Sequence, residues 1–398
     1  LVGSEMCIRD STKFGQEEGD NVDSQEAAYR QFFKDLDEGV KLINEYKKAN
    51  AALEPFAAAD ILMPAGKRTL SQWVKFANSL RLRLAVRVSM SAPDLARAEV
   101  AKAMDATAGG VLESADETVA VSTESGYKNP LGTVNEGWGE VFMGATMESV
   151  LVGYNDPRLI KYYSKAEGGD IKDEKGNLII AERNKIAGTY KGVPQGTGVT
   201  VKDENRYRLH SKSTITKQTD AILMTAAEVW FLRAEAALRG FTSENVKDCY
   251  EKGITVSCQQ WGVNVGDYLT SDATPSDYAD AFEAKYDVEA LIKVTPKWDG
   301  GASPEEQLER ILTQKWIACY PEGYEAWTEQ RRTGYPQLFK VFVNNSGGAI
   351  DTNIRIRRLP YPSDIQKNNP TQYSALKKAL GGEDNGGTRL WWDTGRNF

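Results

Sequence analysis

Histidine and cysteine are scarce in this chain, and that scarcity excludes several kinds of site. The 398 residues include one histidine, His210, and four cysteines without a C-x-x-C pair: Cys7, Cys249, Cys258 and Cys319. A zinc site built from Cys and His therefore lacks ligands. Ser-His-Asp and Cys-His catalysis would both require His210, which lies in a polar run where we expect it to be exposed. We predict neither a catalytic site nor a metal site.

Long apolar runs, basic runs and phosphate-binding glycine motifs are also absent. No apolar stretch reaches the roughly 18 residues that a membrane-spanning helix needs. Lysine and arginine number 49 against 56 acidic residues, and the net charge of −7 argues against a nucleic-acid partner, which requires a basic face. The phosphate-loop and dinucleotide-binding motifs do not occur, so we expect no cofactor.

Helical periodicity is what the chain does contain. Apolar residues recur at three- and four-residue spacing over 24–48, 69–90, 93–110, 224–239, 243–261 and 305–333. Ser303 before Pro304 and two glutamates is an N-cap signal for the last of these segments. Small alanines, with a tyrosine in the second helix of a pair, resemble the tetratricopeptide pattern. Because such pairs bury their apolar faces by stacking, we predict a mainly α fold of stacked, tetratricopeptide-like helical hairpins.

The helical pattern is interrupted between residues 111 and 219, where glycine, asparagine, serine and threonine are frequent. Short strands are predicted there within 177–186 and 198–204. We therefore predict one domain over 13–398, with a helical scaffold at 24–110 and 220–340, a loop-rich, partly β insertion at 111–219, and an irregular C-terminal region at 341–398. Residues 1–12 resemble a non-native N-terminal segment and are left out of the fold prediction.

Two groups of arginines lie in the last third of the chain. Arg331 and Arg332 follow a tryptophan-bearing helical segment, and we expect them to be structural, paired with nearby carboxylates. Isoleucine and arginine alternate over 354–357, which predicts an exposed strand face. Trp391 and Trp392 are expected to pack the C-terminal tail onto the body.

Aromatic residues without a helical stripe to bury them are the candidates for ligand contact. Aromatics make up 10% of the chain, and most of them are expected to serve the core. Tyr127 and Trp138 lie in the glycine-rich middle, and glycines on both sides of Trp138 allow its backbone to approach a partner closely. Trp261, Tyr268 and Trp298 lie in later predicted loops and are second choices.

Four motifs in this chain resemble, in order, those of one known family. They are ILMTAAEVWFLRAEAALRG at 222–240, QKW at 314–316, GYEAWTEQRRTGYP at 323–336 and RIRRLPYPSDIQKNN at 355–369. With these motifs, the chain resembles the SusD/RagB family of outer-membrane nutrient-binding lipoproteins of Bacteroidota from about residue 24 to its end. One motif alone is weak evidence, whereas four in order are strong.

The resemblance implies a SusD-like α-α superhelix and a non-catalytic protein on the extracellular face of the outer membrane. It implies that an oligosaccharide, or a peptide, is bound and delivered to a SusC-like, TonB-dependent transporter. Family members begin with a signal peptide and a lipid-modified cysteine. Because no apolar lipobox precedes Cys7, we expect the N-terminal lipid anchor to be missing from this sequence.

Two functions of other classes remain open at this point. One is a tetratricopeptide-like adaptor that binds only proteins. The other is an extracellular glycan hydrolase, which needs two carboxylates held across a cleft. No spacing in the sequence identifies such a pair, so binding without catalysis is the preferred interpretation.

Overall fold

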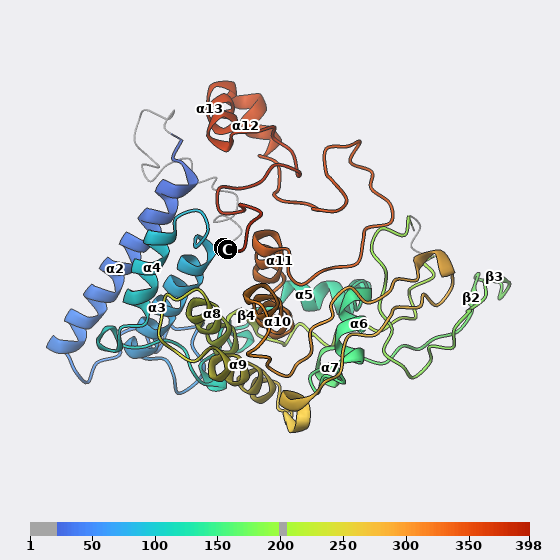
Figure 1. Cartoon of the computed structure of the whole chain (residues 1–398), viewed down its shortest axis with the longest axis horizontal. Coiled ribbons are helices and arrows are strands. Elements are labelled where there is room, and N and C mark those ends of the chain that lie inside the picture. The colour runs from blue at the N-terminus through green and yellow to red at the C-terminus, as the bar shows by residue number, and fades with distance from the viewer. Residues whose placement is uncertain (1–21, 199–204) are drawn as a thin grey trace.

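Helical hairpins form the body of the protein (Figure 1), as the computed structural model of residues 22–198 and 205–398 shows. This confirms the prediction of a mainly α fold. The scaffold helices are α2 (Gln25–Ala49), α3 (Leu70–Arg87), α4 (Pro93–Ala103), α8 (Ala226–Leu238), α9 (Val246–Gln260), α10 (Pro304–Ala318) and α11 (Gly323–Thr333).

Side-chain caps explain where these helices begin. Ser24 caps α2 and Thr69 caps α3, each accepting a backbone N–H three residues further on. Ser303 and Glu306 form a capping box at the start of α10, as the sequence signal indicates. The helix predicted from residue 243 starts later, at α9, because Asn245 supplies the cap.

The hairpins stack in order, which makes one continuous core. Helix α3 packs against α2, α4 and α8, and α8 packs against α9 and α10. The crossing of α8 and α9 is close because residue 253 is a glycine. A Cβ atom at Gly253 would lie 2.8 Å from the ring of Phe231 on α8. A larger residue there would force the two helices apart.

The two ends of the loop-rich segment meet in a two-stranded sheet. Strand β1 (Val119–Val121) pairs antiparallel with β4 (Ala221–Met224). Between them lie three short helices, α5 (Pro130–Thr133), α6 (Ala145–Gly153) and α7 (Leu159–Tyr162). Strands β2 (Ile171–Lys172) and β3 (Leu178–Ile180) form a hairpin at the far edge in Figure 1. Strand β3 falls in the predicted 177–186 strand, whereas the strand predicted over 198–204 lies outside the described residues, apart from residue 198.

The C-terminal region differs from the sequence prediction in two ways. Helices α12 (Ser363–Asn368) and α13 (Pro370–Leu380) form where irregular structure is predicted. The exposed strand face expected over 354–357 is wrong, because Arg355 has a φ of 64° and no strand forms there. Arg357 and Arg358 are instead buried, where they pair with Asp393 and Asp384. The tail packs onto the body as predicted, with Trp392 only 1% exposed.

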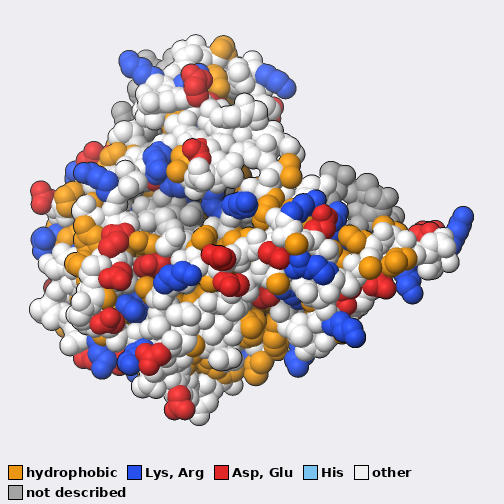
Figure 2. Space-filling view, turned by 45° about the vertical axis from the view of Figure 1, so that its right-hand side comes forward, with side chains coloured by type: hydrophobic (Ala, Val, Ile, Leu, Met, Phe, Trp, Pro, Cys, Tyr) orange, Lys and Arg blue, Asp and Glu red, His pale blue; other side chains and the backbone are white. Residues whose placement is uncertain are grey.

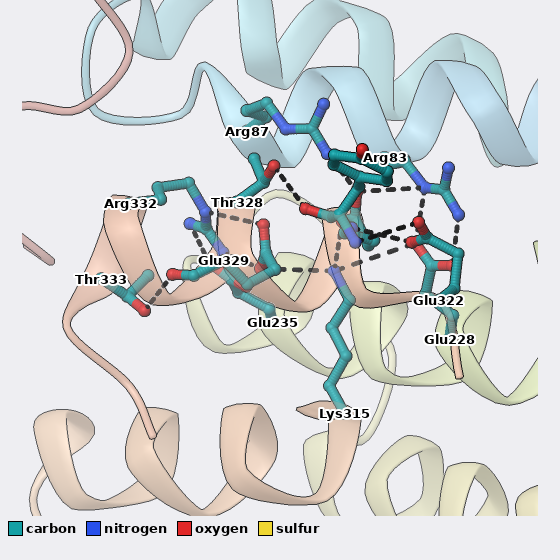
Figure 3. Close-up of polar contacts among 12 residues, drawn as sticks. Arg83, Arg87, Glu228, Glu235, Lys315, Glu322, Thr328, Glu329, Arg332 and Thr333 are labelled. Atoms are coloured by element: carbon teal, nitrogen blue, oxygen red, sulfur yellow. Dashed lines mark hydrogen bonds and ion pairs between the residues drawn. The ribbon is translucent and has the colours of Figure 1, made fainter. Parts of the chain in front are cut away.

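A buried network of ion pairs joins helices α3, α8, α10 and α11 (Figure 3). Arg332 on α11 donates two hydrogen bonds of 2.7 Å to the carboxylate of Glu235 on α8 and two more to the carboxylate of Glu329. Lys315 on α10 lies 3.0 Å from Glu325 and 3.3 Å from Glu329. The predicted structural role of Arg332 is thereby confirmed.

Helix α3 completes this network from the other side. Arg83 binds Glu228 on α8, and Arg87 binds Glu325 on α11. Burial alone would raise the pKa of Glu235, but the guanidinium groups of nearby arginines outweigh it and lower this pKa to about 2. The carboxylate therefore stays ionised at neutral pH and holds the helices together as a charged group.

We expect Glu235→Gln to destabilise the protein by about 3–5 kcal/mol, because it leaves the Arg332 guanidinium buried with less than its full counter-charge. Urea unfolding at pH 7 measures this loss. The control is Glu26→Gln, which breaks the exposed pair with Arg30 on α2 and should cost less than about 0.5 kcal/mol. Equal losses in the two variants would contradict the structural role of the network.

A second carboxylate of this region predicts how stability depends on pH. Burial and the neighbouring carboxylates of Glu325 and Glu228 raise the pKa of Glu322 from 4.5 to about 7. Folding therefore favours the protonated form of Glu322. The stability that the protonated side chain contributes is complete below pH 4.5 and is lost as the pH rises to 7 and beyond. Glu322→Gln should therefore be about 1–2 kcal/mol more stable than the parent at pH 8 but similar at pH 4.5. Thermal melts at both pH values would show it, and a variant that is less stable at pH 8 would refute the assignment.

Candidate functional site

Trp138 stands out on the surface of the loop-rich segment. Helix α5 runs into a single π-helical turn, η4 (Val134–Trp138), which ends at Gly139 with a φ of 65°. The indole of Trp138 is 59% exposed, which is unusual for so large an apolar side chain. Single π-helical turns are frequent at functional sites. Both observations favour Trp138 as a ligand-contacting residue.

The turn that carries Trp138 is held rigidly by its neighbours. The side-chain amide of Asn135 donates hydrogen bonds of 2.8 Å to the carbonyl oxygens of Ser213 and Ile215. The carboxylate of Glu136 accepts the backbone N–H of Lys217 at 2.7 Å. These contacts fasten the turn to the extended segment 213–217, so the exposed indole is presented on a fixed backbone.

A cleft of about 460 Å³ opens beside the β1–β4 sheet. Trp261, at the end of α9, lies in its wall. The other walls come from the loop before α3, from η2 (Ala115–Glu117), from β1 and from β4. Its charged and amide side chains are Lys67, Arg68, Asp116, Glu124, Asp220 and Gln260. Apolar and polar side chains line this cleft in similar numbers, and its volume is in the range that small-ligand sites have.

The rim of this cleft is locked by Asp60. Its carboxylate accepts the backbone N–H groups of Leu62 and Met63 and the indole N–H of Trp73. Two backbone hydrogen bonds also join residues 61 and 62 to β1. The cleft wall is therefore preorganised before any ligand arrives.

Trp261 belongs to an aromatic cluster. Its ring lies 4.8 Å from that of Tyr162 and 5.9 Å from that of Tyr320. The indole N–H of Trp261 and the side-chain oxygen of Gln260 have no hydrogen-bond partner among the described residues. Buried polar atoms without partners are rare in native proteins, and both belong to residues that line the cleft.

The cleft and the Trp138 turn share one segment of chain. Residues 213–217 hold the turn, and the same segment continues to Thr219 and Asp220, which line the cleft. Tyr127 follows Glu124, another lining residue, by three positions and is half-buried. Three of the predicted ligand residues (Tyr127, Trp138 and Trp261) are thus carried by connected elements.

The other two predicted ligand residues lie elsewhere. Tyr268 is only 6% exposed, and its hydroxyl donates to Asp156 and accepts from Gln314, so the side chain serves the core. Trp298 is half-buried against Tyr250 and borders a separate hollow at the start of α9. Neither residue belongs to the cleft beside the β1–β4 sheet or to the Trp138 turn.

The polar residues of the cleft are not among the sequence candidates. They come from segments up to about 200 residues apart, and no local pattern marks their convergence. Pro64 and Gly66 do indicate a loop, but not what that loop faces.

His210 is a correction to the sequence prediction. It is buried, at 2% exposure, and within the described part of the chain neither ring nitrogen has a hydrogen-bond partner. Burial and the nearby Lys191 ammonium lower its pKa to about 3, so the ring is neutral. Edge contact with Tyr207 and packing on Phe282 explain the burial, because the ring fills a small second core as an apolar plate.

The described residues hold no group of three or more His, Cys, Asp and Glu side chains arranged to bind a metal ion. Within the same residues, every helix is too short or too polar to cross a membrane. Figure 2 shows basic and acidic side chains interspersed on one face, without a broad field of either sign.

A stack of helices with a cleft that Trp261 lines and an exposed tryptophan on its loops is an architecture that suits a ligand-binding scaffold. A family model described as SusD-like, for SusD and RagB outer membrane lipoproteins, matches residues 10–393. The chain therefore belongs to the SusD/RagB family of outer membrane lipoproteins. No curated protein matches it significantly.

Solved structures of SusD homologues are similar over almost the whole chain. A homologue from Bacteroides vulgatus shares 49% identity with a TM-score of 0.89, over 98% of this chain and 76% of its own. A chitin-binding homologue from Flavobacterium johnsoniae shares 35% identity with a TM-score of 0.86, over 97% of this chain and 76% of its own. A third, from Bacteroides thetaiotaomicron, shares 32% identity with a TM-score of 0.82, over 94% and 75%.

We expect Asp60→Ala to loosen the cleft rim and to destabilise the protein by about 1–3 kcal/mol, because the Trp73 indole N–H and two backbone N–H groups lose their acceptor. Urea unfolding measures the loss, and limited proteolysis between residues 60 and 68 reports the loosening. Asp60→Asn keeps one acceptor oxygen and should fall between the parent and the alanine variant. Unchanged proteolysis in Asp60→Ala would refute the locking role.

Proposed function

We infer that this protein captures oligosaccharides at the cell surface without altering them, with peptides as the alternative ligand. It then delivers them to a SusC-like, TonB-dependent transporter, to which it is bound on the extracellular face of the outer membrane. The observation that carries the binding proposal is the exposed Trp138 on a rigid turn, connected to the cleft that Trp261 lines. Membership of the SusD/RagB family and the chitin-binding relative support it.

The chemistry of these side chains suits a sugar. A pyranose ring has an apolar face of C–H groups that packs on an indole, and a rim of hydroxyl groups that hydrogen-bonds to planar polar side chains. The cleft supplies such groups in Arg68, Asp220 and Gln260. Pairs such as Lys67 with Asp116, 3.0 Å apart, fix the positions of the charged groups.

The proposal that the bound ligand is not hydrolysed rests on the contacts of two acidic residues in the cleft, Glu124 and Asp220. Glu124 faces Arg68 at 3.8 Å, and one oxygen of Asp220 accepts two hydrogen bonds from Thr123. Both carboxylates are therefore held by their neighbours and support the rim of the cleft. Hydrolysis needs one acid kept protonated across from a second carboxylate.

We expect Trp138→Ala to weaken oligosaccharide binding about 10- to 30-fold, which corresponds to about 1.4–2 kcal/mol, because the sugar loses its stacking surface. Isothermal titration against a polysaccharide panel identifies the ligand and then compares the variant. The matched control is Tyr46→Ala, which removes a partly exposed aromatic side chain from α2. Helix α2 lies at the edge of the helical stack away from α5 in Figure 1, so oligosaccharide affinity should be unchanged in this variant.

Binding and turnover assays on the purified protein test the two rival functions, and an uptake assay in cells tests the delivery step. A blank glycan and peptide panel, with proteins captured instead, would overturn the proposal in favour of an adaptor. Release of reducing sugar from a bound polysaccharide would overturn it in favour of a hydrolase. Ligand uptake that persists after deletion of the transporter would refute the delivery step alone.

A further inference from the structure

Lys212 places an ammonium group next to Gly139, the residue that follows the exposed Trp138. Its Nζ lies 3.9 Å from where a Cβ atom would stand on Gly139, the residue directly after Trp138. Because Gly139 has no side chain, the ammonium and the tryptophan border the same patch of surface. A ligand that stacks on Trp138 therefore comes within reach of this cation.

The backbone at Lys212 is fixed on both sides. It forms an antiparallel bridge with Phe142, and its carbonyl oxygen accepts the N–H of Ser164 at 2.9 Å. The ammonium also lies 5.9 Å from the ring centre of Phe142, which supports the side chain from beneath. The side chain is half-buried, so less conformational freedom is lost when it binds an anion.

Lys212 and Lys217 differ from the other shielded lysines of residues 22–198 and 205–398. The other buried or half-buried lysines each bind a side-chain oxygen at 2.5–3.0 Å: Lys47, Lys67, Lys75, Lys191, Lys315 and Lys377. Among the residues that the structure describes, no ion pair within 4.0 Å involves Lys212 or Lys217. Both belong to the extended segment 212–217 that holds the Trp138 turn, and Glu136 beside them is occupied by the backbone N–H of Lys217.

We propose that the Trp138 surface takes acidic oligosaccharides, with the indole under a sugar ring and Lys212, assisted by Lys217, on the carboxylate of a uronic acid or on a sulfate ester. This rests on the proposed function and names its ligand class. Among the described residues, neither ammonium group forms an ion pair, so both are open to an anionic ligand although the chain carries a net charge of −7. A hydrogen bond between an ammonium group and a carboxylate is stronger than one between neutral groups, above all at a partly dehydrated site. Such bonds would therefore make an acidic sugar bind more tightly than a neutral one.

The test compares polygalacturonate with its fully methyl-esterified form, since esterification removes the charge and keeps the sugar backbone. A sulfated galactan forms a second arm, which separates sulfate from carboxylate recognition. Isothermal titration at 50 and 300 mM NaCl should show that at least one acidic ligand binds about tenfold more tightly than the neutral ester, with the difference shrinking at high salt.

Variants assign the preference to the two lysines. The double variant Lys212→Gln and Lys217→Gln should lose the roughly tenfold preference for the acidic ligand while keeping its affinity for the ester and its thermal midpoint. The control Lys252→Gln, on the exposed face of α9, should keep the preference.

The outcomes distinguish failure of the acidic preference from failure of the proposed function. Equal binding of acidic and neutral ligands, with both lost in Trp138→Ala, overturns the acidic preference and leaves the proposed function standing. An acidic preference that survives the double lysine variant also overturns the assignment. No binding of any glycan overturns both proposals.

Discussion

The buried ion pairs among α3, α8, α10 and α11 are the constraint on which the arrangement of the hairpins depends. An apolar helix face can slide along its neighbour, but Arg332 meets both oxygens of Glu235 only at one relative position of α8 and α11. Lys315 adds α10 through Glu325 and Glu329, and Arg83 adds α3 through Glu228. A charge buried without its partner is costly, so alternative registers of the stack are disfavoured.

A stack held in one register gives the loops a fixed base. The cleft takes its walls from the loop before α3, the sheet of β1 and β4, and the end of α9, so its shape follows from how these helices are placed. Asp60 and the hydrogen bonds around Asn135 and Glu136 then remove the remaining freedom of the loops. Residues that touch a ligand are thus few, while those that position them extend through the body of the protein.

The sequence predicts the scaffold helices well, because periodicity and an N-cap such as Ser303 act over a few residues. It also indicates that Trp138 is exposed, since an aromatic residue between glycines is not part of an apolar helix face, while a role of Trp138 in ligand contact stays a prediction. It does not predict that Arg357 is buried, because its partner Asp393 lies 36 positions away. The same holds for His210, whose polar sequence neighbours give no sign of the second core around Phe282. Long-range convergence also explains why the polar cleft residues and Lys212 escape local patterns.

Pairing of β1 with β4 brings residues 119 and 224 together. The segment of about a hundred residues between them therefore begins and ends at the same place on the helical scaffold. Lengthening a closed excursion of this kind costs little entropy, since the cost grows only with the logarithm of its length. The exposed loops of this segment can therefore change in length during evolution while the pairing of β1 with β4 is kept.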